Sequence, residues 1–257
     1  MRVVRVGLLL IGLFASAAVL ANTRIELLGD LPSPGEKEIV AGLRLGELLQ
    51  QAQISPDGYW LGASWLRESL KQEQKRLKAG VLFDLIQVQR LALLQQKPEL
   101  AAAAQHLEEQ VAALPVTGRR FYHLDPLAVE LNTAHSPRLQ GGDRLIFPYR
   151  PTTVVVRGAV RDSCELPFVA LQQAYRYAQQ CPALVDADPD YLYLIQPDGR
   201  VSRLGVALWN REEAAPPAPG ATLLVPLDAT QIKDSAPNLN QELAEFLATQ
   251  PLSSESP

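Results

Sequence analysis

Two stretches of the chain share one order of apolar and polar positions. "GDRLIFP" (residues 142–148) and "GATLLVP" (residues 220–226) both read Gly, two variable residues, Leu, two apolar residues and Pro. Each predicts a turn and a short strand that ends at Pro, because Pro cannot donate a ladder hydrogen bond. The stretches that begin at Thr23 ("TRIELLGD") and Thr152 ("TTVVVRGAV") also correspond. The chain is therefore predicted to contain two copies of one folding unit.

The first copy must contain an insert, since the starts of the two copies lie farther apart in the sequence than their ends. Apolar residues at helical spacing predict an amphipathic helix from residue 63 to about residue 94. They are Leu66, Leu70, Leu77, Val81, Leu85, Val88 and Leu91. A second apolar stripe follows Pro98 and consists of Leu100, Ala103, Leu107, Val111 and Leu114. Two such helices joined by a short loop predict a helical hairpin, inserted at about 61–114.

The second copy, residues 151–228, has a readable order of elements. "TVVVRGAV" predicts a strand, "CELPF" a returning strand and "VALQQAYRYAQQ" a helix. The buried side of that helix is predicted to carry Leu171, Ala174, Tyr175 and Ala178. "YLYLIQ" and "VSRLGVALW" flank the turn "PDGR", which predicts a hairpin. This order is the β-grasp arrangement, so we expect an α+β fold with two β-grasp domains, at 22–150 and 151–228.

Residues 229–257 are predicted to form a linker and a C-terminal amphipathic helix. Leu239, Leu243, Phe246 and Leu247 fall on one helical face. So short a stripe must bury its apolar side against another surface. We expect it to pack on the second β-grasp domain; an exporter subunit or a membrane surface is the alternative.

Residues 1–21 have the features of a secretory signal peptide. Arg2 and Arg5 precede an apolar run, and "VLA" offers small residues for cleavage after Ala21. The run is shorter than the roughly 20 residues that a helix needs to cross a bilayer, and a retained anchor is the alternative. The mature chain is therefore expected to be periplasmic, in an oxidising compartment, with no transmembrane segment.

The charge and the reactive residues argue against several classes of function. The formal net charge of −4 becomes more negative when Arg2 and Arg5 are removed, which argues against nucleic acid as a partner. The three histidines and two cysteines form no spaced ligand set, so no metal and no cofactor are expected. Nucleophile and phosphate-loop motifs are absent from the sequence, and no catalytic residue is nominated.

The only two cysteines are Cys164 and Cys181. The predicted strand runs away from Cys164 and the predicted helix returns to Cys181, so both sulfurs are expected at one end of the domain. We expect a structural disulfide. Free thiols are the alternative, and a redox pair would more usually be spaced C-x-x-C.

Several motifs, in their order and spacing, resemble the capsule biosynthesis GfcC family. They are "RLGELLQQA", "YWLGASWLR", "LPVTGR", "GGDRLIFPYRPTTVVVRGAV", "YLYLIQPDGRV", "ALWNR" and "PAPGATLLVP". The resemblance covers nearly the whole mature chain and implies SLBB-like β-grasp domains, similar to those of outer-membrane polysaccharide exporters. The chain departs from the family pattern at "DSC" and "QQCPA", and each departure contains one of the cysteines.

The resemblance implies a periplasmic accessory protein in capsular or extracellular polysaccharide assembly or export, without an established catalytic reaction. The implied partners are the polysaccharide, an outer-membrane polysaccharide exporter, or both. A glycan-modifying enzyme is the alternative, and a purely structural partner without glycan contact is a third reading.

Arg119, Tyr59 and Trp60 are the candidate ligand-binding residues. Tyr59 and Trp60 stand where the chain enters the insert, and Arg119 stands where it leaves. The two ends of an insert lie close in space, so an arginine beside two aromatic rings could line a cleft suited to sugars and acidic groups. In the alternative reading, Tyr59 and Trp60 belong to the core and Arg119 pairs with a local acid.

Overall fold

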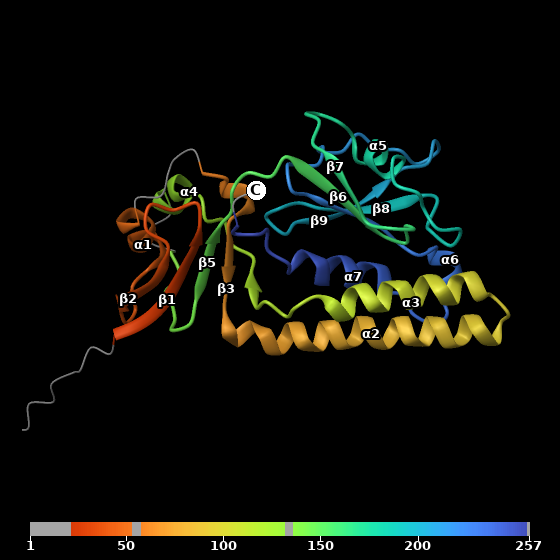
Figure 1. The fold of residues 1–257 in the computed structure, drawn as a ribbon, viewed down its shortest axis with the longest axis horizontal. Coiled ribbons are helices and arrows are strands. Elements are labelled where there is room, and N and C mark those ends of the chain that lie inside the picture. The colour runs from red at the N-terminus through yellow and green to blue at the C-terminus, as the bar shows by residue number, and fades with distance from the viewer. Residues whose placement is uncertain (1–21, 53–57, 132–135, 256–257) are drawn as a thin grey trace, which may run out of the picture.

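The computed structural model describes residues 22–52, 58–131 and 136–255, which form two five-stranded sheets and a layer of helices (Figure 1). The predicted signal peptide, residues 1–21, lies outside the described residues. The first sheet has the strand order β2-β1-β5-β3-β4. Its strands are β1 (Asn22–Gly29), β2 (Gly35–Val40), β3 (Ser64–Leu66), β4 (Arg119–Arg120) and β5 (Arg144–Phe147).

The second sheet repeats this topology, with the strand order β7-β6-β10-β8-β9. Its strands are β6 (Thr153–Gly158), β7 (Cys164–Pro167), β8 (Tyr191–Ile195), β9 (Val201–Gly205) and β10 (Thr222–Val225). In both sheets the first and last strands of the unit, β1 with β5 and β6 with β10, pair in parallel. The predicted fold class of two β-grasp-like units is thereby confirmed. The domain boundaries at 22–150 and 151–228 stay predictions, and each sheet lies within one of these ranges.

The two copies agree even at single residues. Gly29 ends β1 and Gly158 ends β6, and both have positive φ, at 96° and 108°. A Cβ atom would lie 2.0 Å from the Phe147 carbonyl oxygen in the first unit and 2.2 Å from that of Val225 in the second. Both positions therefore need glycine for the same reason, which is the close approach of the parallel partner strand.

The insert consists of two helices, α2 (Lys71–Leu94) and α3 (Pro98–Ala113), between β3 and β4. At the equivalent place in the second unit, β8 and β9 are joined only by the tight turn that contains Gly199. The predicted start of the first helix at residue 63 is wrong, because residues 64–66 form strand β3 and residues 68–70 a 3-10 turn, η2 (Glu68–Leu70). Trp65 explains the difference, since it is fully buried and pairs with Leu145 of β5 in the core of the sheet.

The remaining helices are short. The first unit has η1 (Trp60–Gly62), α1 (Leu45–Gln51) and α4 (Pro126–Glu130), the second has α5 (Ala174–Ala178), and α6 (Ala229–Ile232) follows the second unit. The predicted helix over "VALQQAYRYAQQ" is too long, because Leu171 adopts positive φ (61°) and is 82% exposed. Tyr177, which the prediction omitted, is the buried aromatic residue of α5, and its hydroxyl accepts a hydrogen bond from the Val169 N–H.

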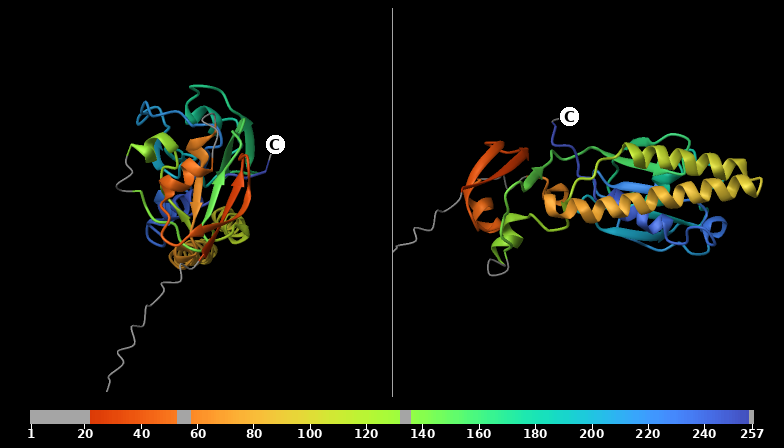
Figure 2. Two further views of the ribbon diagram at one scale, coloured as in Figure 1. Left: turned by 90° about the vertical axis from the view of Figure 1, so that its left-hand side faces the viewer. Right: turned by 90° about the horizontal axis from the view of Figure 1, so that it is seen from below.

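The C-terminal helix α7 (Leu239–Ala248) lies between the helical hairpin and the second sheet (Figure 1). Its predicted apolar residues Leu239, Leu243, Phe246 and Leu247 are all buried within the chain. One continuous core contains α2, α3, α7 and the second sheet, while a separate core fills the first unit. The hairpin therefore belongs to the first unit by sequence but to the second by packing, and it extends away from the first sheet along the second (Figure 2).

None of the helices in the described part of the chain is both long and apolar enough to cross a membrane.

Candidate functional site

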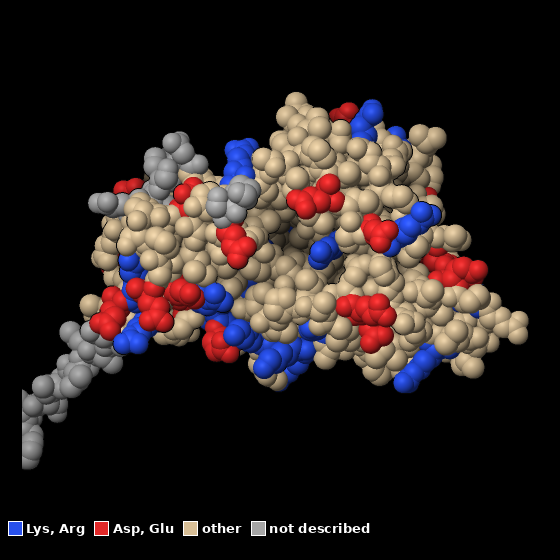
Figure 3. Space-filling view, in the orientation of Figure 1, with Lys and Arg blue, Asp and Glu red and all other residues tan. Residues whose placement is uncertain are grey.

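A cleft of about 600 Å³ lies between corresponding faces of the two sheets. Strands β1, β3 and β5 line one side, strands β6, β8 and β10 line the other, and the chain from Gln250 to Glu255 passes along it. Figure 3 shows the surface hollowed where the two units and the helices meet. The charged lining residues are Lys71, Arg119, Arg144, Arg157 and Glu255. Positive charge therefore dominates the described lining of the cleft.

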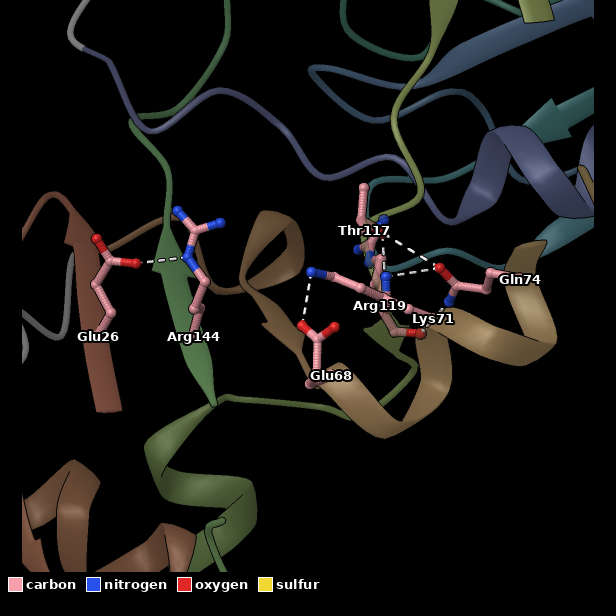
Figure 4. Close-up of polar contacts among 8 residues, drawn as sticks. Glu26, Glu68, Lys71, Gln74, Thr117, Arg119 and Arg144 are labelled. Carbon is pink, nitrogen blue, oxygen red and sulfur yellow. Dashed lines mark hydrogen bonds and ion pairs between the residues drawn. The ribbon is translucent and has the colours of Figure 1, made fainter. Parts of the chain in front are cut away.

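Two of the four cations are paired with carboxylates (Figure 4). The Lys71 ammonium lies 2.6 Å from a carboxylate oxygen of Glu68, and Arg144 Nε lies 2.5 Å from Glu26 Oε2. All four side chains are substantially exposed, so each pair adds little to stability. The pairs do reduce the positive charge that Lys71 and Arg144 present to the cleft.

Arg119 is buried, with 4% of its surface exposed, and both of its terminal nitrogens donate to backbone carbonyls. Nη1 donates to the carbonyl oxygens of Ala248 and Gln250, and Nη2 donates to that of Pro197. Burial lowers the pKa of Arg119 to about 10, and the nearby Asp198 carboxylate partly opposes this shift. Arg119 thus holds the end of α7 and the β8–β9 turn against strand β4.

Gln74 of α2 fixes the backbone around Arg119 (Figure 4). Its side-chain nitrogen donates to the Arg119 carbonyl at 2.9 Å, and its side-chain oxygen accepts from the Gly118 N–H at 2.7 Å. The Thr117 hydroxyl donates to the Thr249 carbonyl. These bonds connect the helical hairpin, strand β4 and the end of α7 into one polar network.

Tyr59 and Trp60 do not line the cleft. The Tyr59 hydroxyl donates to the Pro219 carbonyl at 2.5 Å, and the Arg150 guanidinium lies 5.5 Å from the Tyr59 ring centroid. Burial raises the pKa of Tyr59 to about 12, Arg150 opposes the shift and Asp198 adds to it. The Trp60 ring meets Phe147 edge to face at 5.9 Å.

The structure gives each of the three predicted site residues a role in holding the fold together. Arg119 and Tyr59 both contact the second unit, and both have the Asp198 carboxylate as a charged neighbour. Trp60 packs against the core of the first unit. The ligand-binding role of Arg119, Tyr59 and Trp60 stays a prediction. The contacts described above have a structural explanation that involves no ligand.

Arg157 is a cleft residue that the sequence reasoning missed. Its Nε atom is fully buried and has no hydrogen-bond partner among the described residues, and burial lowers the pKa of its guanidinium. A signal was present in the sequence, because the matched stretches "TRIELLGD" and "TTVVVRGAV" place Leu28 and Arg157 at corresponding positions. An arginine where the other copy has leucine is a departure that the fold does not demand.

Cys164 and Cys181 form the predicted disulfide, with Cα atoms 5.9 Å apart, so this prediction is confirmed. The bond joins the start of β7 to the loop after α5. Neither cysteine lines the cleft.

The described residues offer no cluster of three or more His, Cys, Asp or Glu side chains that could hold a metal ion. Among the residues that line the cleft, Glu255 is the single carboxylate.

Two family descriptions match this chain. The family description "Capsule biosynthesis GfcC, N-terminal" matches residues 32–147, and "Capsule biosynthesis GfcC C-terminal" matches residues 162–251. A relative from Escherichia coli (strain K12), named "Uncharacterized protein YjbG", is 32% identical over 147 residues. That alignment spans 57% of this chain and 60% of the relative.

Proposed function

This chain belongs to the capsule biosynthesis GfcC family, and we propose from that premise that it is a periplasmic accessory protein of polysaccharide assembly or export. In this role it binds the capsular or extracellular polysaccharide, its outer-membrane exporter, or both, and it catalyses no reaction. The polysaccharide is the partner that the cleft best accommodates.

The observation that carries the proposal is the cleft itself. Its volume of about 600 Å³ is within the usual range for small-molecule sites. Its lining combines apolar strand residues with an excess of cations. Such a surface suits the C–H faces of sugar rings and the acidic groups that many polysaccharides carry.

A binding role also fits the distribution of acids better than a hydrolytic one. Glycosidases place two carboxyl groups on either side of the bond that they break, about 5–9.5 Å apart. The described lining of the cleft contains one carboxylate, that of Glu255, which lies on the exposed tail segment. This supports binding over cleavage.

The disulfide supports the proposed compartment, because disulfides form and persist in oxidising environments such as the periplasm. Cleavage of the signal peptide after Ala21 is part of the proposal. N-terminal sequencing of the exported protein tests it, and an exported chain that still begins at Met1 would contradict it.

A deletion strain tests the function as a whole. We expect surface capsule or exopolysaccharide to fall while synthesis of the repeat unit in the cytoplasm continues. Normal surface polysaccharide, under conditions in which the locus is expressed, would refute the proposal.

Incubation of the purified protein with the polysaccharide of the same cells separates the proposed role from the enzymatic alternative. Retention of the protein on a column of that polysaccharide, with no change in chain length, is the expected result. A fall in chain length would indicate a glycan-modifying enzyme instead.

A further inference from the structure

Arg157 is the cleft cation whose charge the described residues leave uncompensated. Lys71 and Arg144 pair with glutamates, and Arg119 donates to three carbonyls. Arg157 forms no ion pair and no side-chain hydrogen bond within the described chain. A guanidinium without a partner in a partly buried place is unfavourable, because it loses water contacts and gains no others.

The strand directs Arg157 toward the cleft. Residues of β6 alternate in burial, with Val154, Val156 and Gly158 buried and Val155 and Arg157 on the opposite, more exposed face. Val155 and Arg157 both line the cleft. Arg157 also lines a narrow gap between α3, α7 and the second sheet.

The internal repeat indicates that the fold does not need an arginine here. Leu28 pairs with Ile146 across β1 and β5, as Arg157 pairs with Leu224 across β6 and β10. Leu28 also lines the cleft, from the opposite sheet. The same backbone position is thus occupied by a leucine in one unit and by an unpaired arginine in the other.

We propose that Arg157 is the anchor for a carboxylate of an acidic sugar residue bound in the cleft. The inference rests on the proposed function, in which the cleft binds polysaccharide. A planar guanidinium presents a fork of N–H donors that matches a carboxylate with two parallel hydrogen bonds. Apolar side chains such as Val155, Ile146 and Leu252 line the same cleft and can contact the sugar ring.

A singly charged carboxylate fits this site better than a phosphate monoester. One guanidinium is uncompensated, while Lys71 and Arg144 already share their charge with Glu68 and Glu26. A phosphate monoester with a charge near −2 would need a second free cation.

The test measures binding of the polysaccharide purified from the same cells, in its native form and after chemical reduction of its carboxyl groups. Wild type is compared with Arg157→Leu, which places in the second unit the residue that the first unit uses at this position. Arg90→Leu is the matched control, because Arg90 is exposed on α2 and outside the cleft.

We expect Arg157→Leu to weaken binding of the native polysaccharide roughly ten- to a hundredfold, which is the usual effect of losing a charged hydrogen bond. Carboxyl reduction should weaken wild-type binding to the same extent and should not weaken Arg157→Leu further. Arg90→Leu should bind like wild type. The melting temperature of Arg157→Leu should equal or exceed that of wild type, because an unpaired guanidinium is removed.

The outcomes separate the inference from the function on which it rests. If native and carboxyl-reduced polysaccharide bind wild type equally well, the inference is wrong and the binding function stands. If neither form binds, the polysaccharide-binding function itself fails. A competition experiment with small anions tests the choice of carboxylate. If inorganic phosphate displaced the native polysaccharide from wild type at a lower concentration than glucuronate, a monosaccharide with one carboxylate, that choice would be overturned. A large loss of stability in Arg157→Leu would show that Arg157 supports the fold and not a ligand.

Discussion

Arg119 on β4 of the first sheet donates from Nη2 to the carbonyl oxygen of Pro197 in the β8–β9 turn of the second sheet. The same guanidinium donates from Nη1 to the carbonyls of Ala248 and Gln250 at the end of α7. One side chain thereby connects both units and the C-terminal helix, and its geometry argues for a structural role.

Arg119→Ala is expected to lower the free energy of unfolding by about 2–4 kcal/mol, because three carbonyls lose a charged donor. Urea denaturation measures the change, with exposed Arg90→Ala as the control that should leave stability nearly unchanged. If Arg119→Ala kept full stability but lost polysaccharide binding, Arg119 would be the ligand residue that the sequence predicted.

Tyr59 should make stability depend on alkaline pH. Its pKa is raised to about 12 in the folded chain, whereas an unfolded tyrosine ionises near pH 10. The folded state therefore keeps a proton that the unfolded state loses, so stability is full below about pH 10 and falls as pH rises toward about 12. We expect Tyr59→Phe to show a smaller fall over this window in urea denaturation.

The lowered pKa of Arg119 acts in the opposite direction over the same window, since the folded state releases that proton first. The Arg119 contribution is present in both wild type and Tyr59→Phe. The difference between the pH profiles of these two proteins therefore reports the contribution of Tyr59 alone. Identical pH profiles for the two proteins would contradict the prediction.

Loss of the disulfide should destabilise the second unit. The bond closes a loop with a sequence separation of 17, and such a loop restricts the unfolded chain by about 3 kcal/mol. The double variant Cys164→Ser, Cys181→Ser should therefore melt several degrees lower than oxidised wild type. Reduced wild type, which also lacks the bond, should melt at nearly the same temperature as the double variant. Equal melting temperatures of oxidised and reduced wild type would show that the bond does not stabilise the fold.

Phe246 should be essential for stability and not for partner contact. It is fully buried on α7 between the hairpin and the second sheet. Phe246→Ala should cost about 3–5 kcal/mol, the usual range for a large buried side chain. Glu245→Ala, at the exposed neighbour, should stay within about 0.5 kcal/mol of wild type.

A normally stable Phe246→Ala protein that no longer supports surface polysaccharide would instead favour the reading in which α7 docks on an exporter. Truncation after Asp228 removes the whole of α7. We expect that change to act through loss of the core.

The repeat could be predicted because strand ends depend on local chemistry. The glycines at positive φ and the prolines after β5 and β10 are visible in the sequence without any knowledge of tertiary contacts. The start of the first helix of the hairpin could not be predicted, because Leu66 and Leu70 fit a helical stripe as well as they fit a strand followed by a turn. Burial of Trp65 decided between them, and burial is a tertiary property.

The site was harder to predict than the fold. Arg119 was recognised as special from its place beside the insert, but its partners at Pro197, Ala248 and Gln250 lie far away in the sequence. Arg157 differs from its counterpart Leu28 in the repeat, but that difference alone does not predict a site, because a solvated arginine would give the same pattern. The unpartnered buried Nε, which marks Arg157 as a candidate, is visible only in three dimensions.

The dependence of Arg119 on residues 248–250 also sets an order of events during synthesis. A chain is made from its N-terminus, and early segments begin to fold before late ones exist. The first sheet can therefore pair its strands before α7 exists, but the two hydrogen bonds from Arg119 Nη1 have to wait for residues 248–250. Residues 250–255 form part of the cleft wall, so the lining is complete only after this last segment has folded into place, and ligand binding reports on that step.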